Sequence, residues 1–526
     1  MTKVSKANME QGKILWVDDE IASFKPHVMV LEGKGYHVTT ASSGAEAIEL
    51  MDGQPFDCIL LDEHMPGQTG LDCLPIMHRK APNVPIIMIT KSEEDGVMED
   101  AIGEAIADYL LKPVQPRQVL ASLTRVLGRK RLIEGRSVET YRASFAALTE
   151  KISTADSWDE WQAIYQEWID WERRLEGSDA ESMRPMLTYQ KEEANRLFIR
   201  FYAKNYPQWI TSQDAPCDFS HQILDRYVSP LLHEGRKVVL LVIDNLRLDH
   251  WHDIQPFFTD SFRVKEQMVV SSMLPTATQY ARNAMFAGML PADIAKRYPD
   301  KWVKDVLDTK PGRNAHEALF FQDWASRKGL SKPAYGKLSN AQAEKQWVDQ
   351  WHQVKGKSLV GLVVNFVDRI SHAKTDQSIV KDLATDDRGF KALTYGWWKN
   401  SPLRHWVNAL ADEGYELIVT TDHGTLSVEK AIQVKGPKEI SANMRYKVGR
   451  GLQFKDKEVP LAVKPESIGL PSVALGDQII FAGGTDFFVY PNQFHRYAGQ
   501  FAGSYQHGGI SMEELMIPLA HLVPKG

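Results

Sequence analysis

The sequence predicts an α/β protein with three parts: an amino-terminal doubly wound parallel sheet, a central three-helix bundle and a larger carboxyl-terminal α/β domain. Two observations support this prediction. Short apolar runs alternate with helical stretches over residues 12–128 and again over residues 226–526, as in sheets covered by helices. Residues 129–225 show helical periodicity without strand-like runs. Residues 1–11 form a polar tail, and a chain of 526 residues is too long for one hydrophobic core.

Bulk composition excludes several functional classes. A net charge of -6 argues against a protein whose main role is to bind duplex DNA or an anionic membrane. No apolar run approaches the roughly 20 residues that span a bilayer, and the amino terminus lacks the apolar centre of a signal peptide. We therefore expect a cytoplasmic protein without membrane insertion. The 3 cysteines are scattered without CxxC spacing, so a metal site would have to use Asp and His.

Polar side chains stand at the ends of the strands expected within residues 12–128. The first strand runs into Asp18 and Asp19, and later strands end at Asp62, Thr90 and Lys112. The carboxyl ends of parallel strands meet at one edge of a sheet, so these side chains should lie together. Clustered carboxylates repel one another unless a cation separates them, which predicts Mg²⁺ beside Asp62. Asp62 can then attack a phosphoryl donor, with Thr90 and Lys112 stabilising the acyl phosphate.

These residues resemble the receiver domain of two-component response regulators over residues 12–128. The resemblance rests on the Asp pair after the first strand, on DEHMPGQTG beginning at Asp62, on Thr90, and on Lys112 followed by Pro113. It implies a sensor histidine kinase as phosphodonor and a homodimer promoted by phosphorylation. It also implies that Tyr109 is an aromatic switch that turns inward when Thr90 moves toward the phosphoryl group.

The middle segment predicts three helices, over residues 127–152, 157–176 and 182–210. The second begins with Ser157 and Glu160 in capping-box spacing. One face of it is aromatic, with Trp158, Trp161, Tyr165, Trp168 and Trp171. Such a stripe could stack nucleic-acid bases, but the residues between are acidic, which favours the core of a bundle. The segment resembles neither a helix-turn-helix nor a winged helix.

Candidate metal ligands follow three strands and one glycine-rich loop of the carboxyl-terminal domain. They are Asp244, Asp368, His372, Asp422, His423 and His507. An Asp-His pair alone would equally fit a capping Asp beside a partly exposed His. Together, the oxygen and nitrogen ligands suit two Zn²⁺ or Mn²⁺ ions, with a position left for substrate. A second pair, Asp249 and His250, lies further into the following helix and is set aside.

The order of these ligands resembles the alkaline phosphatase superfamily, and more closely its PglZ branch, over residues 226–526. The resemblance implies two Zn²⁺ ions, one held by Asp368, His372 and His507. The other is held by Asp244, Asp422 and His423. The stretch PTATQYARN resembles the nucleophile turn of nucleotide phosphodiesterases, which makes Thr278 the expected nucleophile. Thr276, Ser271 and Ser272 remain alternatives, and a threonine here would also suit a helix N-cap.

The tandem of all three parts resembles the PorX-like response regulators of Bacteroidota, which are linked to type IX secretion. This implies contact with secretion components or a sigma factor. The function expected is a zinc-dependent phosphodiesterase acting on short or cyclic oligonucleotides, and not on duplex DNA, under receiver control. The alternative is a non-enzymatic adaptor that dimerises on phosphorylation and recruits those partners. Four cations could contact phosphate oxygens but are more commonly surface charges: Arg247, Arg282, Arg445 and Lys447.

Overall fold

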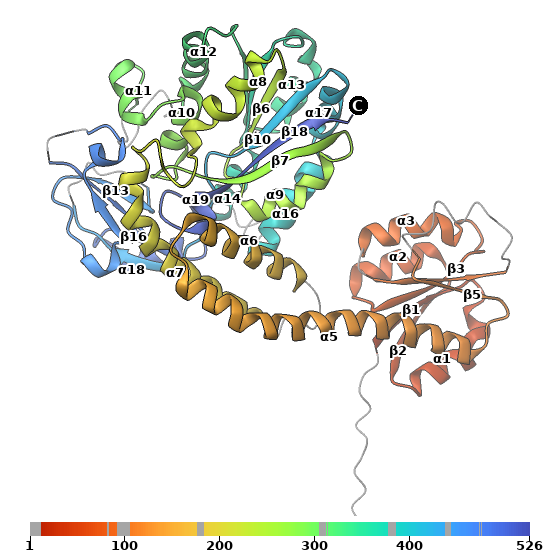
Figure 1. Ribbon diagram of the computed structural model, residues 1–526. Helices are drawn as coiled ribbons and strands as arrows, with labels where there is room; N and C mark the ends of the chain where they lie inside the picture. Colours follow the sequence, from red (N-terminus) through yellow and green to blue (C-terminus); the bar gives the residue numbers. More distant parts are fainter. Residues whose placement is uncertain are drawn as a thin grey trace, which may run out of the picture. The chain divides into compact units, whose positions relative to one another are not determined.

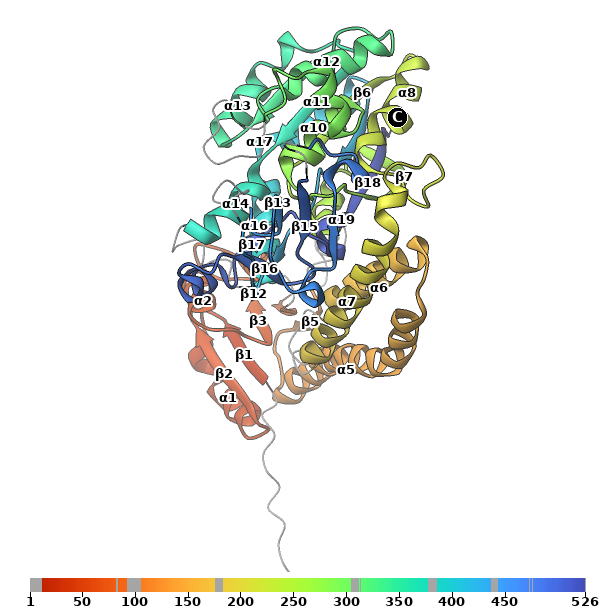
Figure 2. The ribbon, with the colours of Figure 1, turned by 90° about the vertical axis from the view of Figure 1, so that its left-hand side faces the viewer.

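The computed structural model describes residues 12–81, 84–91, 106–175, 183–303, 312, 314–376, 386–436, 443–472, 474 and 476–525. The chain forms two compact units, drawn as ribbons in Figures 1 and 2. The first comprises residues 1–143 and 174–183, and the second comprises residues 144–173 and 184–526. Among the described residues, none of the helices has the length and apolar character needed to cross a membrane.

The first unit contains a parallel five-stranded sheet in the order β2-β1-β3-β4-β5. The strands are β1 Gly12–Val17, β2 Tyr36–Ala41, β3 Cys58–Asp62, β4 Ile86–Thr90 and β5 Asp108–Leu111. The helices are α1 Lys25–Glu32, α2 Gly44–Gly53, α3 Gly70–Lys80 and the beginning of α5 Pro116–Thr154. Side chains of β1 alternate between two cores, with Ile14 and Trp16 on one face and Leu15 and Val17 on the other. The doubly wound fold is confirmed.

The linker helices are α5, α6 Trp158–Arg174 and α7 Arg184–Trp209. The backbone of α5 is helical without interruption through residue 128, where a domain boundary was expected. All five aromatic side chains of the α6 stripe are buried, and Lys191 of α7 covers the ring of Trp168. The stripe is therefore a helix-packing face, as expected, and its rings are not available for stacking bases.

The second unit is built on a six-stranded sheet in the order β7-β18-β10-β6-β9-β8. The strands are β6 Lys237–Ile243, β7 Phe262–Ser271, β8 Ala334–Leu338, β9 Leu359–Val364, β10 Tyr415–Thr420 and β18 Met516–Pro524. Strands β8, β9, β6 and β10 are parallel, whereas β18 runs antiparallel between β10 and β7. The carboxyl ends of β6, β9 and β10 therefore meet at one edge, which is where the expected ligands stand.

Helices pack on this sheet, and smaller sheets complete the unit. One face of β6 packs against α10 and α12 through an apolar core that includes Leu240, Phe286 and Trp324. The helices are α8 Ser229–His233, α9 Leu248–Ile254, α10 Thr278–Ala287, α11 Pro291–Arg297, α12 Glu317–Arg327, α13 Ala341–Asp349, α14 Phe366–Asp376, α16 Asp387–Asn400, α17 Pro402–Asp412, α18 Phe494–Phe501 and α19 Met512–Leu515. The smaller strands are β11 Leu426–Ser427, β12 Lys430–Gln433, β13 Tyr446–Gly449, β14 Leu461–Val463, β15 Gln478–Phe481, β16 Asp486–Val489 and β17 Tyr505–Gln506.

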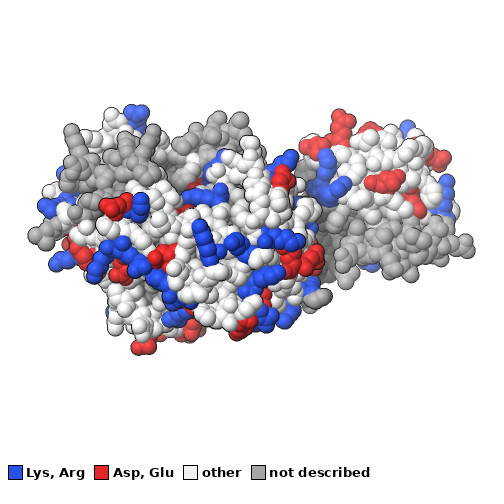
Figure 3. Space-filling model, turned by 90° about the horizontal axis from the view of Figure 1, so that it is seen from above, with Lys and Arg blue, Asp and Glu red and all other residues white. Residues whose placement is uncertain are grey.

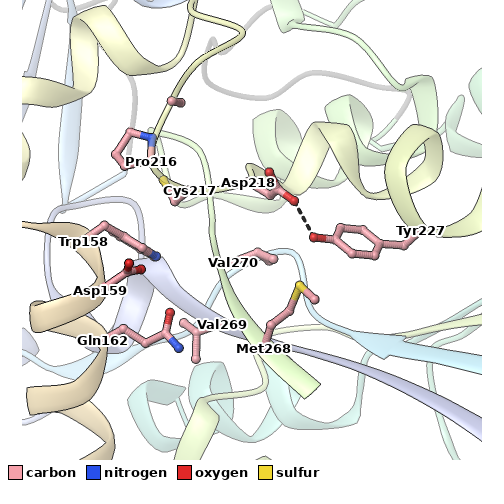
Figure 4. A pocket seen from close by; sticks show the side chains of 11 residues that line it. Trp158, Asp159, Gln162, Pro216, Cys217, Asp218, Tyr227, Met268, Val269 and Val270 are labelled. Carbon is pink, nitrogen blue, oxygen red and sulfur yellow. Dashed lines mark hydrogen bonds between the residues drawn. The ribbon is translucent and has the colours of Figure 1, made fainter. Parts of the chain in front are cut away.

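A cavity of about 230 Å³ lies where α6 meets the sheet of the second unit (Figure 4). Trp158, Asp159 and Gln162 line it from α6, and Met268, Val269 and Val270 line it from β7; residues 215–218 and Tyr227 complete the wall. The hydroxyl of Tyr227 donates to Asp218 at the rim. None of the expected site residues lines this cavity, so it is separate from the candidate sites described next.

Candidate functional site

The receiver unit brings Asp18, Asp19 and Asp62 together, with one oxygen of each within 4.8 Å of the others. Asp18 and Asp19 follow β1 and Asp62 ends β3, so the parallel register sets this juxtaposition. Lys112 Nζ lies 2.9 Å from Asp18 Oδ2 and 2.8 Å from Asp62 Oδ1. Burial raises the pKa of Asp62, while Lys112 opposes that rise. Asp62 Oδ2 has no hydrogen-bond partner among the described residues. An acidic triad of this kind is typical of Mg²⁺.

The two expected switch residues lie on neighbouring strands. Thr90, at the end of β4, is buried, whereas Tyr109 on β5 is 60% exposed. The ring of Tyr109 is therefore outside the core in this structure.

In the second unit, Asp244, Asp422 and His423 form a buried trio with ligand atoms within 4.8 Å of one another. Asp244 follows β6, and the other two follow the adjacent strand β10. Asp244 Oδ1 and Asp422 Oδ2 have no hydrogen-bond partner among the described residues. Burial of a carboxylate oxygen without a partner is costly, so a cation at this position would satisfy both. The trio could hold a metal.

A second trio comprises Asp368, His372 and His507. Asp368 and His372 lie one turn apart on α14, and His507 follows β17. The distance to Asp368 Oδ1 is 3.3 Å from His372 Nε2 and 3.8 Å from His507 Nε2. The rings of His507 and His423 stack with centroids 4.2 Å apart, which places the two trios side by side.

The imidazoles at this site can present lone pairs to metals. Burial lowers the pKa of His423, and burial lowers the pKa of His507 to about 3. His423 Nδ1 lies 3.1 Å from the carbonyl oxygen of Gly424, and His507 Nδ1 lies 3.1 Å from that of Thr276. A carbonyl only accepts, so each Nδ1 carries the proton and each Nε2 is left as a donor of electrons. The residues therefore fit a divalent metal such as zinc.

Of the four candidate nucleophiles, Thr278 is the one whose hydroxyl contacts the side chain of a trio residue. Thr278 Oγ1 lies 3.1 Å from His423 Nε2. The other hydroxyls bond elsewhere: Thr276 donates to the Gly509 carbonyl oxygen, Ser272 donates to the Asp422 carbonyl oxygen, and Ser271 contacts the Tyr202 hydroxyl. The N-cap of α10 is Ala277, so Thr278 occupies the first helical position and its hydroxyl does not serve as the cap.

The second Asp-His pair belongs to neither of the two trios. Asp249 accepts a hydrogen bond of 2.9 Å from Arg247 Nε. His250 packs against the ring of Phe390, with centroids 4.7 Å apart, and burial lowers its pKa to about 3. Both residues lie within α9, where a helix rather than a strand end directs their side chains.

The expectation that the four cations are surface charges is wrong. Arg247, Arg282 and Arg445 are at most 1% exposed, and Lys447 is 3% exposed. Each arginine is buried because a buried carboxylate lies against it: Asp249 against Arg247, Asp244 and Glu317 against Arg282, and Glu514 against Arg445. Arg282 could have been noticed from the sequence, because it follows Thr278 by one helical turn.

Asn245 is a functional candidate that no sequence motif indicated. It follows Asp244 with a φ of 67°, a left-handed conformation that side-chain-bearing residues seldom adopt. Its Nδ2 donates to Ser371 Oγ at 3.0 Å, between Asp368 and His372 on α14. Its backbone N–H points to Asp422 Oδ1 at 3.4 Å. Asn245 therefore ties the first trio to the helix that carries the second.

Comparison with known families divides the chain into three matches. Residues 14–124 match the response regulator receiver domain, residues 131–210 match the PorX response regulator linker domain, and residues 223–522 match the BREX system PglZ alkaline phosphatase-like domain. The PglZ match covers more than half of the chain. The chain belongs to the PglZ family. With its receiver and linker, this PglZ-family chain is a PorX-like response regulator. Its receiver implies phosphorylation by a sensor histidine kinase.

Curated relatives of the PorX-like regulator match it over about a quarter of its length. The alginate biosynthesis transcriptional regulatory protein AlgB of Pseudomonas syringae is 38% identical over 126 residues, which is 24% of this chain and 28% of AlgB. The transcriptional regulatory protein ResD of Bacillus subtilis is 37% identical over 120 residues, or 23% of this chain and 49% of ResD. The match thus spans less than half of the length of either relative. Among solved structures, a response regulator receiver domain from Clostridium thermocellum is 29% identical in sequence and has a TM-score of 0.22. The match covers 23% of this chain and 97% of the receiver domain's chain.

Proposed function

We propose that this response regulator is phosphorylated on Asp62 and that its PglZ domain is a zinc-dependent phosphodiesterase with Thr278 as nucleophile. The observation that carries the proposal is the 3.1 Å contact between Thr278 Oγ1 and His423 Nε2, beside a buried trio whose carboxylate oxygens lack partners. In the receiver, Asp18, Asp19 and Asp62 would hold Mg²⁺. In the PglZ domain, each of the two trios would hold one Zn²⁺.

Zinc bound at the trios would lower the pKa of a hydroxyl and neutralise charge on a phosphoryl group. The chain's own residues perform the rest. Thr278 Oγ gives up its proton and attacks phosphorus, the bond from phosphorus to one ester oxygen breaks, and that oxygen takes up a proton and leaves as an alcohol. The phosphorus stays bonded to Thr278 and keeps its second ester. Water then attacks that phosphorus and restores the threonine hydroxyl. The hydrogen bond from His423 Nδ1 to the Gly424 carbonyl oxygen fixes the ring, so its one Nε2 lone pair, which lies 3.1 Å from Thr278 Oγ1, would bind zinc beside that hydroxyl.

Phosphodiesters suit this site better than monoesters. At neutral pH, a phosphate monoester carries nearly one more negative charge than a phosphodiester does. Hydrolysis of a monoester therefore usually requires an additional cation at the site. Among the described residues, the PglZ domain contains two trios and no third cluster of this kind, and the buried Arg282 is already paired with Asp244 and Glu317. A net charge of -6 also disfavours a long duplex, whose binding requires an extended basic track. On the face drawn in Figure 3, Lys and Arg side chains lie beside acidic and uncharged ones. Short or cyclic oligonucleotides are the proposed substrates.

Cleavage of a nitrophenyl phosphodiester and of a short oligonucleotide by metal-replete protein tests the proposal. Thr278→Val deletes the hydroxyl with little change of shape, so we expect loss of turnover with zinc content unchanged. Thr394→Val is the control, because that buried hydroxyl bonds to the Phe390 carbonyl oxygen within α16. Undiminished cleavage by Thr278→Val would remove the nucleophile assignment. A wild type that cleaves no diester would instead favour the phosphorylation-controlled adaptor, recruiting a sigma factor or type IX secretion components.

A further inference from the structure

One face of linker helix α7 contacts the loops that carry the proposed active site. Its side chains are Lys191, Asn195, Tyr202 and Tyr206, whose spacing keeps them on one face of a helix. Asn195 is 6% exposed, and both tyrosines are fully buried. Polar groups buried at this depth require partners. Each of these side chains finds its partner on the PglZ domain.

The carboxyl-terminal half of this face holds the segment that leads to Thr278. The backbone N–H of Leu274 donates to the Tyr206 hydroxyl at 2.8 Å, four residues before Thr278. The Tyr202 hydroxyl lies 2.8 Å from Ser271 Oγ, at the end of β7. The adjacent Ser272 hydroxyl donates to the carbonyl oxygen of Asp422 at 2.6 Å. The two phenols thus fix residues 271–274 between α7 and a proposed zinc ligand.

The amino-terminal half of the same face holds α19, which precedes β18. Asn195 accepts from the Met512 N–H and donates to Glu513 Oε2, both at 2.9 Å. Lys191 Nζ lies 2.8 Å from Glu513 Oε1. The next residue, Glu514, accepts from the backbone N–H of Gly509 at 2.9 Å, two residues after His507. A Cβ on Gly424 would lie 2.0 Å from the Glu513 carbonyl oxygen, so the loop of His423 packs directly on α19.

The two loops held by α7 are also bonded to each other beneath Thr278. Gly508 N–H donates to Thr276 Oγ1 at 2.9 Å, and His507 Nδ1 bonds to the Thr276 carbonyl oxygen at 3.1 Å. Displacement of residues 271–276 would therefore move Thr278 relative to both His423 and His507. A shift of about 1 Å at a reacting group can reduce a rate on the order of 100-fold.

We propose that Tyr202 and Tyr206 of the linker are positioning residues for Thr278, which makes the linker a component of the effector's active site rather than a spacer. This inference rests on the proposed phosphodiesterase function. Removing the Tyr206 hydroxyl leaves the buried Leu274 N–H without its acceptor, so the turn before Thr278 relaxes toward another conformation. Among the described residues, the phenols bond to residues 271–274 and not to Thr278 or to a trio residue. Their loss therefore reduces kcat and leaves KM and zinc content near wild type.

The experiment compares Tyr206→Phe and Tyr202→Phe with Tyr165→Phe. Tyr165 is a matched control, because it is a buried linker tyrosine whose hydroxyl has no hydrogen-bond partner among the described residues. Steady-state cleavage of a nitrophenyl phosphodiester should show kcat reduced by about 10- to 100-fold for the two α7 variants. Tyr165→Phe should match wild type. Wild-type kcat in Tyr206→Phe, or an equal loss in Tyr165→Phe, would overturn the proposal.

Two further measurements separate this inference from the proposed function and from misfolding. Hydrogen–deuterium exchange of a peptide covering residues 272–281 should accelerate in Tyr206→Phe and not in Tyr165→Phe, whether or not the protein turns over substrate. Equal exchange in all variants would defeat the positioning role. Ser271→Ala removes the partner of Tyr202 from the other side. We expect its kcat loss to be non-additive with that of Tyr202→Phe, since both delete one contact. Additive losses would contradict a shared contact.

Discussion

At the scale of single residues, charge buried between the linker and the PglZ domain is mostly compensated by opposite charge. Lys191 Nζ lies 3.7 Å from Asp387 Oδ2 and 2.8 Å from Glu513 Oε1, and Arg247 Nη1 lies 3.2 Å from Asp387 Oδ2. Burial opposes the charged form of both groups, but Arg247 and Lys191 hold the pKa of Asp387 below its usual range, and Glu513 and Asp387 raise the pKa of Lys191. Glu172 differs, because its Oε2 has no hydrogen-bond partner among the described residues. Burial raises the pKa of Glu172 from 4.5 to about 7.

Glu172 should make the stability of the second unit depend on pH. A carboxyl whose pKa is raised on folding stabilises the fold fully below pH 4.5 and loses that contribution as the pH rises to about 7. The pKa difference corresponds to about 3 kcal/mol above pH 7. Glu172→Gln removes the ionisation, so we expect this variant to exceed wild type in free energy of unfolding at pH 8 by more than at pH 5. Denaturant titrations measure both values, with Glu192→Gln on the exposed face of α7 as control. An identical difference at the two pH values would show that Glu172 does not titrate in this range.

At the scale of elements, the residues that stand at the ends of strands could be predicted from the sequence. The side-chain contacts between elements that are distant in the sequence could not. The apolar runs of β6 and β10 locate Asp244 and Asp422, because neighbouring parallel strands deliver their following residues to the same edge. The partners of α7 are different, since Asn195 and Glu513 are 318 positions apart. Periodicity shows that one face of α7 is buried and does not identify what covers it. Arg282 and Arg445 were misjudged for the same reason, because their carboxylate partners Asp244 and Glu514 come from distant segments.

The loop after β10 and the loop after β17 should be required for metal binding, and α9 should not. His423→Ala and His507→Ala each remove one ligand of a different trio, so we expect each to reduce zinc content from close to two ions per chain. His250→Ala should retain both ions, because its ring packs on Phe390 and His250 belongs to neither trio. Elemental analysis of protein purified without chelator provides the measurement. Loss of zinc from His250→Ala, with retention in His423→Ala, would reverse the choice between the two Asp-His pairs.

At the scale of the whole molecule, the sequence predicted three parts but not the helix that joins them. The linker was expected to begin after residue 128, yet that position lies within the 39-residue helix α5. Gly128 made a boundary at this point plausible, because glycine is unfavourable in helices. A single glycine lowers the stability of a helix by only about 1 kcal/mol relative to alanine, however, and does not end it. Val119 and Leu123, near the beginning of α5, belong to the receiver core. Near its end, Phe145 and Thr149 accept hydrogen bonds from Gln190, the neighbour of Lys191.

Phosphorylation of the whole chain should depend on Asp62 and on Mg²⁺, because the carboxylates of Asp18 and Asp19 cannot neutralise an incoming phosphoryl group. A small acyl-phosphate donor with Mg²⁺ should phosphorylate wild type and promote its dimerisation. We expect Asp62→Ala to abolish both effects and Asp52→Ala, at an exposed position on α2, to preserve them. Phosphate-affinity electrophoresis and light scattering measure the two effects. Phosphate incorporated by Asp62→Ala at another residue would contradict the assignment.

The placement of β18 has a consequence for the order in which the protein can mature. Residues 516–524 form an inner strand of the PglZ sheet, between β7 and β10. During translation, residues 12–127 leave the ribosome early and can fold as a unit, whereas the effector sheet has a gap until the β18 residues are made. A nascent chain would therefore contain a receiver able to accept phosphate before the proposed metal site of the PglZ domain is complete. A chain shortened after residue 515 should keep phosphorylation on Asp62 and lose zinc, so the effector cannot act before its synthesis has passed β18.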